Sequence, residues 1–486
     1  MDQFYLRNAI QYQALVDAFK PMYLTGALNS SDATSPDMVV SARIRPLLGD
    51  DMVAGFPCAV FPRHSQPGVL DIHDLYNHPR GRPILKSFNY QVDKLFTPDT
   101  TTEEIYQDLL IGLVPFARQG GIGTIFAYGQ TGSGKTFTIS RLEQLVMESL
   151  TISIPEEEKD ESQPHIRLTI IELAGNSAFD LLSARKPISI LEDASGTTQL
   201  SGAAEHQIHT IGDALSLIDR AASLRKTAST MKNDTSSRSH SICRIRIANP
   251  SANTEGFLYL VDLAGSEAAR DVATHGAERM RETKDINLSL SVLKDCIRGR
   301  AEWDVQVKSG AKGKKPRMPF RQSALTKVLK HVFDTTAGGR ECKTAVIACV
   351  NPSLADVGAS KNTLRYAEML RVLMPRVGKN EGEGYGVFEW GNGEVREWII
   401  QNCGTPPISP NILAPTESGA EILRLSALEF DYRCLKNPGV TREQTEALRS
   451  KLWQLHIDSQ RQSTTATPAL SSTGTDSSMS TAHELA

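Results

Sequence analysis

Residues 129–136, Gly-Gln-Thr-Gly-Ser-Gly-Lys-Thr, constrain the fold more than any other stretch of the chain. They have the spacing of a phosphate-binding loop, Gly-x-x-x-x-Gly-Lys-Ser/Thr. An apolar, β-prone segment at 124–128 precedes them, and residues 137–146 read as a helix. The motif needs this strand–loop–helix context, so a chance glycine turn is the weaker interpretation.

The loop predicts a nucleotide site. Its glycines let successive backbone N–H groups turn inward around phosphate oxygens, and the helix N-terminus adds partial positive charge. We expect the ammonium group of Lys135 to reach the β- and γ-phosphates and the Thr136 hydroxyl to ligate Mg²⁺. The predicted nucleotide-binding residues of the loop are Gly129, Gln130, Thr131, Gly132, Ser133, Gly134, Lys135 and Thr136.

Composition narrows the class of protein. With 486 residues, 40% apolar and 22% charged, the chain can form one large α/β domain or several smaller ones. A net charge of −3 gives no global basic field, so we expect no nucleic-acid partner and require a local patch for any acidic partner. Seven cysteines without a C-x-x-C pair indicate reduced thiols. Because no signal peptide or membrane-spanning apolar run is evident, we expect a soluble, cytoplasmic protein without a membrane partner.

Pattern and composition divide the chain into four parts. Residues 1–36 are expected to be an N-terminal appendage and linker, and 37–373 the main domain. Residues 374–458 read as a Gly/Pro-rich linker with short helices, and 459–486 as a disordered Ser/Thr-rich tail. The helix expected at 441–457 is interpreted as a docking helix on the main domain, the alternative being a dimer seam. No segment sustains the heptads of a long coiled coil, which leaves the oligomeric state open.

Alternating strands and helices within 37–373 predict an α/β domain with a central sheet. Residues 49–87 read as irregular. Strands are expected at 38–47, 87–93, 124–128, 166–173, 244–247, 257–261 and 345–350, and helices at 101–118, 137–146, 213–225 and 285–298.

Two further motifs narrow the chemistry. Residues 233–240, Asn-Asp-Thr-Ser-Ser-Arg-Ser-His, precede a strand and suit a loop that closes on a γ-phosphate and the Mg²⁺ shell, a plain polar turn being the alternative. Residues 262–267, Asp-Leu-Ala-Gly-Ser-Glu, end an apolar strand. The strand would bring Asp262 to the Mg²⁺ side, and Gly265 would offer its N–H to the γ-phosphate. This is the arrangement of a P-loop nucleoside triphosphatase.

Taken in order, Arg43-x-Arg45-Pro46, GQTGSGKT, N-x-x-SSRSH and DLAGSE resemble the kinesin motor domain. Residues 191–196, 286–293, 319–326 and 362–367 are similar to further motifs of that family. The resemblance covers residues 37–373. It implies a P-loop NTPase fold with a central, mainly parallel sheet flanked by helices on both faces. It also implies an ATP hydrolase that uses ATP and Mg²⁺.

The resemblance also implies roles for individual residues. Arg45 and Pro46 would pack against adenine, with Phe137 stacking from the other side, where kinesins usually carry His. The residues implied in catalysis are Ser236 and Ser237, which would organise the Mg²⁺ water shell and the attacking water, Gly265, and the closing ion pair of Arg238 with Glu267. The implied metal ligands are Thr136, Ser237 and Asp262.

The implied partner is the microtubule, and the implied location the cytoskeleton. Tubulin is acidic, so a basic surface is required. Residues 307–317 lie between the two helices that kinesins use to bind tubulin, although a solvated loop or a nuclear-import signal would share this composition. The expected microtubule-binding residues are Lys294, Arg298, Lys308, Lys312, Lys314, Lys315, Arg317, Lys327 and Lys330.

The kinesin subtype rests on fewer residues. Residues 294–298, Lys-Asp-Cys-Ile-Arg, are similar to a signature of internal-motor kinesins, which remove tubulin from microtubule ends. Their Lys-Val-Asp tip is not evident, and Ile72-His73-Asp74-Leu75 is the nearest candidate. The loop that interrupts the P-loop helix in kinesins is expected to be short. Our leading hypothesis is that the protein depolymerises microtubule ends. The alternatives are a translocating motor and a non-hydrolysing microtubule-binding scaffold.

Overall fold

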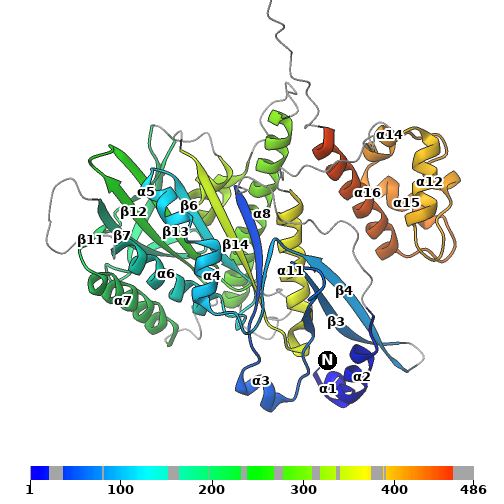
Figure 1. The fold of residues 1–486 in the computed structure, drawn as a ribbon, viewed down its shortest axis with the longest axis horizontal. Coiled ribbons are helices and arrows are strands. Elements are labelled where there is room, and N and C mark those ends of the chain that lie inside the picture. Colours follow the sequence, from blue (N-terminus) through cyan, green and yellow to red (C-terminus); the bar gives the residue numbers. More distant parts are fainter. Residues whose placement is uncertain are drawn as a thin grey trace, which may run out of the picture. The chain divides into compact units, whose positions relative to one another are not determined.

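The computed structural model describes residues 2–20, 37–78, 81–151, 164–194, 196–230, 238–266, 277–308, 318–334, 340–373, 387 and 390–463. The chain divides into two compact units, Met1–Pro375 and Arg376–Ala486. Figure 1 shows the first unit as a large sheet with helices on its faces and the second as helical. In the described part of the chain, no helix is both long enough and apolar enough to cross a membrane.

Eleven of the described strands form one large, mixed sheet in the order β10-β9-β8-β7-β12-β13-β6-β14-β1-β5, with β11 beside β7. Strands β13, β6, β14, β1 and β5 run parallel, whereas the pairs from β13 outward to β10 are antiparallel. The bounds are β1 Met38–Ile44, β5 Lys94–Phe96, β6 Ile122–Tyr128, β7 His165–Ala174, β8 Ser177–Asp180, β9 Lys186–Glu192, β10 Thr198–Ser201, β11 His206–Ile208, β12 His240–Asn249, β13 Thr254–Asp262 and β14 Cys342–Val350.

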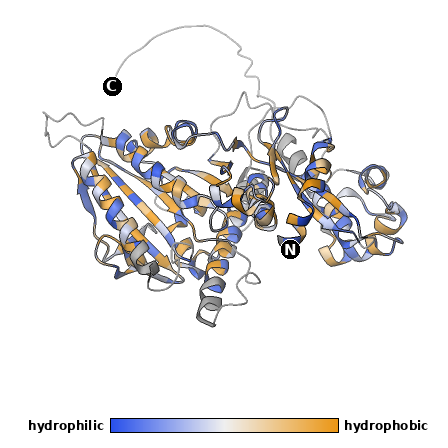
Figure 2. Ribbon diagram, turned by 90° about the horizontal axis from the view of Figure 1, so that it is seen from below, coloured by the Kyte–Doolittle hydropathy of each residue, from blue (hydrophilic) through white to orange (hydrophobic). Residues whose placement is uncertain are grey.

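Helices cover both faces of this sheet, which confirms the expected architecture. The core on one face is built with α4 (Thr102–Leu109), α5 (Leu113–Arg118), α6 (Lys135–Thr151) and α7 (Ile211–Thr230). The core on the other face is built with α8 (Ala277–Lys308), η3 (Phe320–Gln322), α9 (Ala324–Val328), α10 (Lys330–Phe333), η5 (Leu354–Asp356) and α11 (Val357–Leu373). Because both faces are covered, every residue of β6 is buried. The helices carry hydrophobic residues interspersed with hydrophilic ones (Figure 2).

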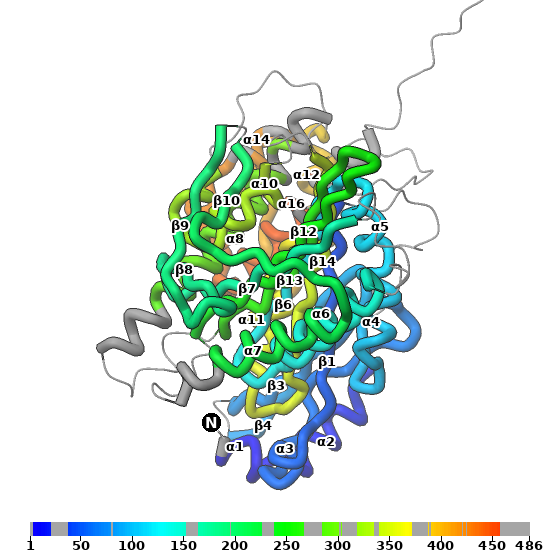
Figure 3. The backbone as a smooth tube through the Cα atoms, turned by 90° about the vertical axis from the view of Figure 1, so that its left-hand side faces the viewer, coloured from blue at the N-terminus to red at the C-terminus, as the bar shows by residue number. Residues whose placement is uncertain are grey.

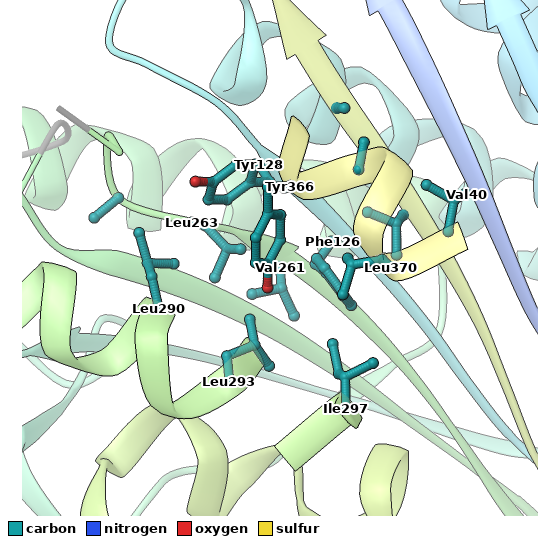
Figure 4. Packing of buried hydrophobic residues seen from close by; sticks show 14 of the residues in the cluster. Val40, Phe126, Tyr128, Val261, Leu263, Leu290, Leu293, Ile297, Tyr366 and Leu370 are labelled. Atoms are coloured by element: carbon teal, nitrogen blue, oxygen red, sulfur yellow. The ribbon is translucent and has the colours of Figure 1, made fainter. Parts of the chain in front are cut away.

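The core under α8 and α11 is tightly packed. Figure 4 shows Leu293 and Ile297 of α8 facing Val261 of β13, with Tyr366 of α11 above them. The rings of Tyr128 and Tyr366 lie 4.3 Å apart between centroids. Cys296 lies on α8 and is fully buried, so it is a packing residue of this core. Burial raises the pKa of its thiol to about 12, so this cysteine is not a thiolate at neutral pH.

A second, three-stranded sheet occupies much of the region expected to be irregular. It consists of β2 (Val60–Pro62), β3 (Val69–Asn77) and β4 (Pro83–Gln91), and α3 (Gly49–Ala54) precedes it. The N-terminal helices α1 (Asp2–Arg7) and α2 (Ala9–Asp17) pack against it. The fully buried Tyr12 donates its hydroxyl to the carbonyls of Cys58 and His73.

Residues 72–75, the nearest sequence candidate for the Lys-Val-Asp tip, lie inside β3 and not at a hairpin tip. Asp74 is buried and accepts hydrogen bonds from the hydroxyl of Tyr5 at 3.1 Å and the ammonium of Lys361 at 2.5 Å. Its carboxylate joins α1, β3 and α11. The sequence could not show this, because the three partners are far apart along the chain.

The bounds of the observed helices differ from the expected ones, and two cases have a local explanation. The segment 101–118 is two helices, α4 and α5, separated by residues 110–112. Gly112 lies in this break, and Pro115 has no N–H to continue an α-helical ladder through it. In contrast, α6 runs without interruption from Lys135 to Thr151. This agrees with the expectation that the loop interrupting this helix is short.

The second unit has its own hydrophobic core. Its helices are α12 (Asn392–Asn402), α13 (Pro410–Leu413), α14 (Gly419–Arg424), α15 (Ala427–Leu435) and α16 (Arg442–Ser463). Leu448 and Leu452 of α16, which the sequence suggested as part of a docking helix, are buried in this core with Ile399 and Phe430. Residues 390–463 therefore form a folded helical unit.

Candidate active site

The sheet brings the predicted motifs to one edge. Asp262, the last residue of β13, pairs in register with Ala127 of the parallel strand β6, and the phosphate-binding loop begins two residues later at Gly129. Strand β12 runs the opposite way, so its beginning lies at the same edge, with Ser241 opposite both Asp262 and Glu172. The ends of β6, β13 and β7 and the start of β12 therefore converge there.

The backbone of the phosphate-binding loop requires glycine. Gly129 has φ 152°, and a Cβ there would lie 2.3 Å from the carbonyl oxygen of Cys349. Gly132 and Gly134 have φ of 76° and 95°. These conformations are strained for residues with a side chain. Lys135 is buried, and its Nζ donates to the carbonyl of Gln130 at 2.8 Å.

The Mg²⁺ side of the site is built around Asp262. Its Oδ2 accepts hydrogen bonds from the Thr136 hydroxyl at 2.7 Å and from Nη1 of Arg225 at 2.6 Å. Its Oδ1 is buried and has no hydrogen-bond partner among the described residues. Mg²⁺ prefers oxygen ligands and keeps several bound waters, which hydrogen-bond to carboxylates. The hydroxyl of Thr136 and the carboxylate of Asp262 therefore fit the expected ion. The sequence reasoning missed Arg225, whose place on a predicted helix gave no sign of this contact.

The second half of the 233–240 motif lies against this centre. The backbone carbonyl of Ser239 accepts from Nη2 of Arg225 at 2.7 Å, and its hydroxyl donates to Glu172 at 2.7 Å. Arg238 is described and half-buried, and it has interaction partners. Gly265 is buried, and the next residue, Ser266, donates its N–H to the carbonyl of Gly129 at 3.1 Å. Ser236, Ser237 and Glu267 lie outside the described residues.

His240 connects this loop to the next motif and to α8. Its Nδ1 accepts the backbone N–H of Ala264 at 3.0 Å, and its Nε2 lies 2.9 Å from the hydroxyl of Ser289. Because Ser289 donates to the carbonyl of Ile286, His240 must donate through Nε2. Burial, with the nearby charges of Arg225 and Lys135, lowers the pKa of His240 to about 3. It is a neutral structural residue, not a proton carrier.

The expected adenine side is more open. Phe137 is 68% exposed, and the guanidinium of Arg43 lies 5.3 Å from its ring centroid. The guanidinium of Arg45 donates to Asp51 at 2.6 Å and to the carbonyl of Pro46 at 2.7 Å. The Asp51 ion pair thus fixes Arg45 next to Pro46, and Phe137 offers an exposed aromatic ring beside Arg43.

Glu143 is a buried carboxyl that the sequence reasoning missed. It lies on α6 two helical turns beyond Thr136 and is 9% exposed. Burial, and secondarily the charge of Asp262, raises its pKa to about 8, against the smaller opposing effect of Arg225. The carboxyl is therefore mostly protonated at neutral pH.

The predicted basic surface is only partly accessible. Lys294 and Lys327 are half-buried, and Arg298 is exposed, 3.7 Å from Asp295. Lys330 is buried instead, with its Nζ 2.9 Å from Glu192 of β9, so it is a structural ion-pair partner and not a surface cation. The side chain of Lys308 and all of Lys312, Lys314, Lys315 and Arg317 lie outside the described residues.

Arg321 is an exposed cation that the expected set omitted. It also approaches Glu192, at 3.2 Å, from η3. The sequence could have indicated Arg321, because it lies in the 319–326 motif just before Lys327.

Comparison with known proteins gives a consistent result. Residues 43–373 match the kinesin motor domain. Diatom spindle kinesin-1 of Cylindrotheca fusiformis is 33% identical over 360 residues, which cover 72% of this chain and 53% of that protein. The human kinesin-like protein KIF24 is 33% identical over 289 residues, 58% of this chain and 20% of that protein. The chain thus spans about half the length of the first relative and about a fifth of the second.

Solved kinesin structures share the fold. The structure of a fast kinesin, described for its ATPase mechanism and interactions with microtubules, aligns with a TM-score of 0.56 at 25% identity. It covers 71% of this chain and 95% of that one. The C-terminal motor and motor homology domain of Kar3Vik1 aligns with a TM-score of 0.54 at 27% identity over 69% of this chain and 85% of that one. The chain belongs to the kinesin motor domain family.

Proposed function

We propose that this protein hydrolyses ATP and that microtubules stimulate the hydrolysis. The observation that carries the proposal is the convergence of Thr136, Asp262 and Arg225 at the edge where the phosphate-binding loop begins. Members of the kinesin motor domain family are ATPases, and the match covers the whole of this site. The protein would be found with microtubules in the cytoplasm.

The residues would act by position and charge. The N–H groups of the glycine-rich loop and the ammonium of Lys135 would hold the phosphates. Bound Mg²⁺ would neutralise phosphate charge, held through Thr136 and, with its waters, Asp262. Arg238 and Glu267 would pair when the two loops close around ATP. Breaking that pair should stop hydrolysis more than binding.

Helix α8 would carry the nucleotide state to the microtubule. His240 is hydrogen-bonded both to the N–H of Ala264 and to the hydroxyl of Ser289 on α8. A movement of the segment at His240 or of the one at Ala264 would therefore be transmitted to α8 through direct hydrogen bonds. The same helix presents Lys294 and Arg298. A basic surface of this kind suits an acidic tubulin surface, and its binding should weaken with salt.

Hydrolysis of ATP by the purified protein, with and without microtubules, tests the proposal. We expect microtubules to increase the rate, and Glu267→Ala to bind ATP without hydrolysing it. Changing Lys312, Lys314 and Lys315 together to Ala should weaken co-sedimentation with microtubules. Normal turnover by Glu267→Ala would overturn the ion-pair assignment, and unchanged co-sedimentation would make residues 307–317 a plain surface loop.

As the finer function we propose removal of tubulin from microtubule ends, based on the Lys-Asp-Cys-Ile-Arg sequence at 294–298. The burial of Asp74 favours the second candidate, a translocating motor, because residues 72–75 cannot act as a contact tip. Imaging of stabilised fluorescent microtubules separates the two. End shortening that requires ATP supports depolymerisation, gliding at constant length supports translocation, and nucleotide-independent static binding would indicate a scaffold.

A further inference from the structure

A continuous series of polar contacts runs from the surface to the nucleotide site. Nη2 of Arg185 lies 2.7 Å from Oε2 of Glu172, and Oε1 of Glu172 accepts from the hydroxyl of Ser239 at 2.7 Å. From Ser239 the series continues through Arg225 to Asp262, with distances of 2.7 and 2.6 Å. Neither the sequence motifs nor the proposed chemistry assigns a role to Arg185.

The turn that carries Arg185 is held in an unfavourable conformation. Ala184 and Arg185 have φ of 51° and 57°, in the left-handed region that non-glycine residues rarely occupy. Such conformations persist where surrounding contacts impose them, and they cluster at functional sites. Here the guanidinium of Arg185 also lies 5.0 Å from the ring centroid of Phe179 on β8. The turn thus places the arginine between that ring and Glu172.

Glu172 depends on this arginine. Its side chain is fully buried, whereas that of Arg185 is 32% exposed. The ion pair with Arg185 is the one salt bridge that Glu172 makes among the described residues. Removing one partner of a buried ion pair leaves a charge without compensation, which is strongly unfavourable. Separating Arg185 from Glu172 would therefore disturb the carboxylate that holds Ser239.

On its other side, Arg185 directly precedes β9, the first strand of the β9–β10 hairpin. Glu192 at the far end of β9 pairs with Lys330 and Arg321, and the hydroxyl of Thr198 on β10 donates to the carbonyl of Lys327. The hairpin therefore packs on α9 and α10, which in turn contact α8. In the view of Figure 3, the β9–β10 hairpin overlies the region of α8 and α10.

We propose that Arg185 is a positioning residue that couples the β9–β10 hairpin to the nucleotide site through Glu172 and Ser239. The inference rests on the proposed function in one respect, namely that an acidic tubulin surface bears on the hairpin and its neighbouring cations. Movement of β9 on binding pulls Arg185 away from Glu172. The carboxylate then releases the hydroxyl of Ser239, which loosens the loop that Arg225 ties to Asp262.

The test measures release of a fluorescent ADP analogue from the full-length protein, with and without microtubules. Arg185→Ala should raise the microtubule-free release rate and reduce the acceleration by microtubules, lowering the ratio of the two rates by about fivefold or more. Arg185→Lys should restore part of the ratio. The matched control is Lys186→Ala, an exposed neighbour at the start of β9, which should leave both rates unchanged.

A double-mutant cycle separates coupling from plain loss of stability. Ser239→Ala removes the other contact of Glu172 and should shift the ratio in the same way, and the double variant should add nothing further. Independent, multiplying effects of Arg185→Ala and Ser239→Ala would overturn the proposal. So would a lowered melting temperature with an unchanged ratio. If Arg185→Ala does not fold, the ratios of release rates measured for Arg185→Lys and Ser239→Ala test the proposal instead.

The proposed function and this inference can fail separately. If microtubules accelerate nothing in the wild-type protein, the proposed function fails. The microtubule-free release rates still decide whether Arg185 holds the loop, because only Arg185→Ala, and not Lys186→Ala, should raise them. Equal rates in these two variants would refute the role of Arg185.

Discussion

Replacing Glu143 with Gln should stabilise the protein, and more so at higher pH. In the unfolded chain this carboxyl loses its proton near its ordinary pKa of 4.5, whereas burial in the folded state raises the pKa to about 8. Between these values the folded state binds more protons than the unfolded state. The wild-type stability that Glu143 provides is therefore present below pH 4.5 and lost as the pH rises toward 8. The amide introduced by Glu143→Gln cannot titrate, so the variant lacks this loss.

The size of the effect follows from the same shift. Each pH unit in this window corresponds to ~1.4 kcal/mol, so raising the pH from 5.5 to 7.5 should increase the advantage of the variant by ~2.7 kcal/mol. A unit the size of Met1–Pro375 has an unfolding entropy of roughly 0.8 kcal/mol/K, which converts that difference to about 3 °C. The variant's melting temperature should gain this much over the wild type between the two pH values.

Thermal unfolding of both proteins at pH 5.5 and 7.5, with saturating Mg-ADP in every sample, measures this difference at constant ligand. Glu148→Gln is the matched control, because Glu148 lies on the same helix but its side chain is 40% exposed. It should show no growing advantage. A melting-temperature difference between Glu143→Gln and wild type that stays constant over the two pH values would refute the reasoning.

Three further predictions concern other parts of the molecule. Gly129→Ala should weaken nucleotide binding by about tenfold or more, ~1.4 kcal/mol, because its Cβ would lie 2.3 Å from the carbonyl of Cys349; titration with a fluorescent ATP analogue measures it. Burial lowers the pKa of His331 from 6.5 to about 3 in the folded protein. As the pH falls below 6.5, the ring is therefore protonated in the unfolded chain but not in the folded protein, and wild-type stability decreases. His331→Gln can keep the hydrogen bond to Thr124 and should gain ~1.6 kcal/mol relative to wild type between pH 6.5 and 5.0, measured by urea unfolding. Leu448→Ala should destabilise the C-terminal unit by ~2–5 kcal/mol and lower only that unit's transition in calorimetry of the full chain.

These predictions have clear controls. Gly49→Ala, where an added Cβ meets nothing within 4 Å, should bind nucleotide normally. A pH-independent stability difference for His331→Gln would contradict a buried neutral ring. A shift of both calorimetric transitions by Leu448→Ala would contradict a C-terminal core of its own.

Local sequence patterns predicted where in the fold the motif residues lie, when a neighbouring strand fixes their position. The glycine-rich loop, Asp262 and the end of the 233–240 motif each adjoin a strand, and parallel or antiparallel register then brings them to one edge. Residues 191–196, which are similar to a family motif, lie at the turn of the β9–β10 hairpin, where Gly196 has φ 79°. Residues fixed by short-range geometry were therefore predictable.

Residues that act through distant partners were not predictable. Arg225 and Glu143 read as ordinary polar positions on helices, and their roles follow only from the packing of α6 and α7 beside β13. Lys330 reads as a surface cation, but Glu192, far away in sequence, holds it in a buried pair. The sequence predicted a linker with short helices for residues 374–458, but not a unit with its own core, because short helices gain their stability from packing on one another.

The measurement that tests the central claim most directly is steady-state ATP hydrolysis by the purified full-length protein over a microtubule titration at low salt. Lys135→Ala serves as the catalytically impaired control, since it removes the buried ammonium of the phosphate-binding loop. The account predicts a rate that rises to saturation with microtubules, falls with added salt, and is absent in the control. Hydrolysis that does not respond to microtubules, or equal rates in wild type and Lys135→Ala, would contradict it.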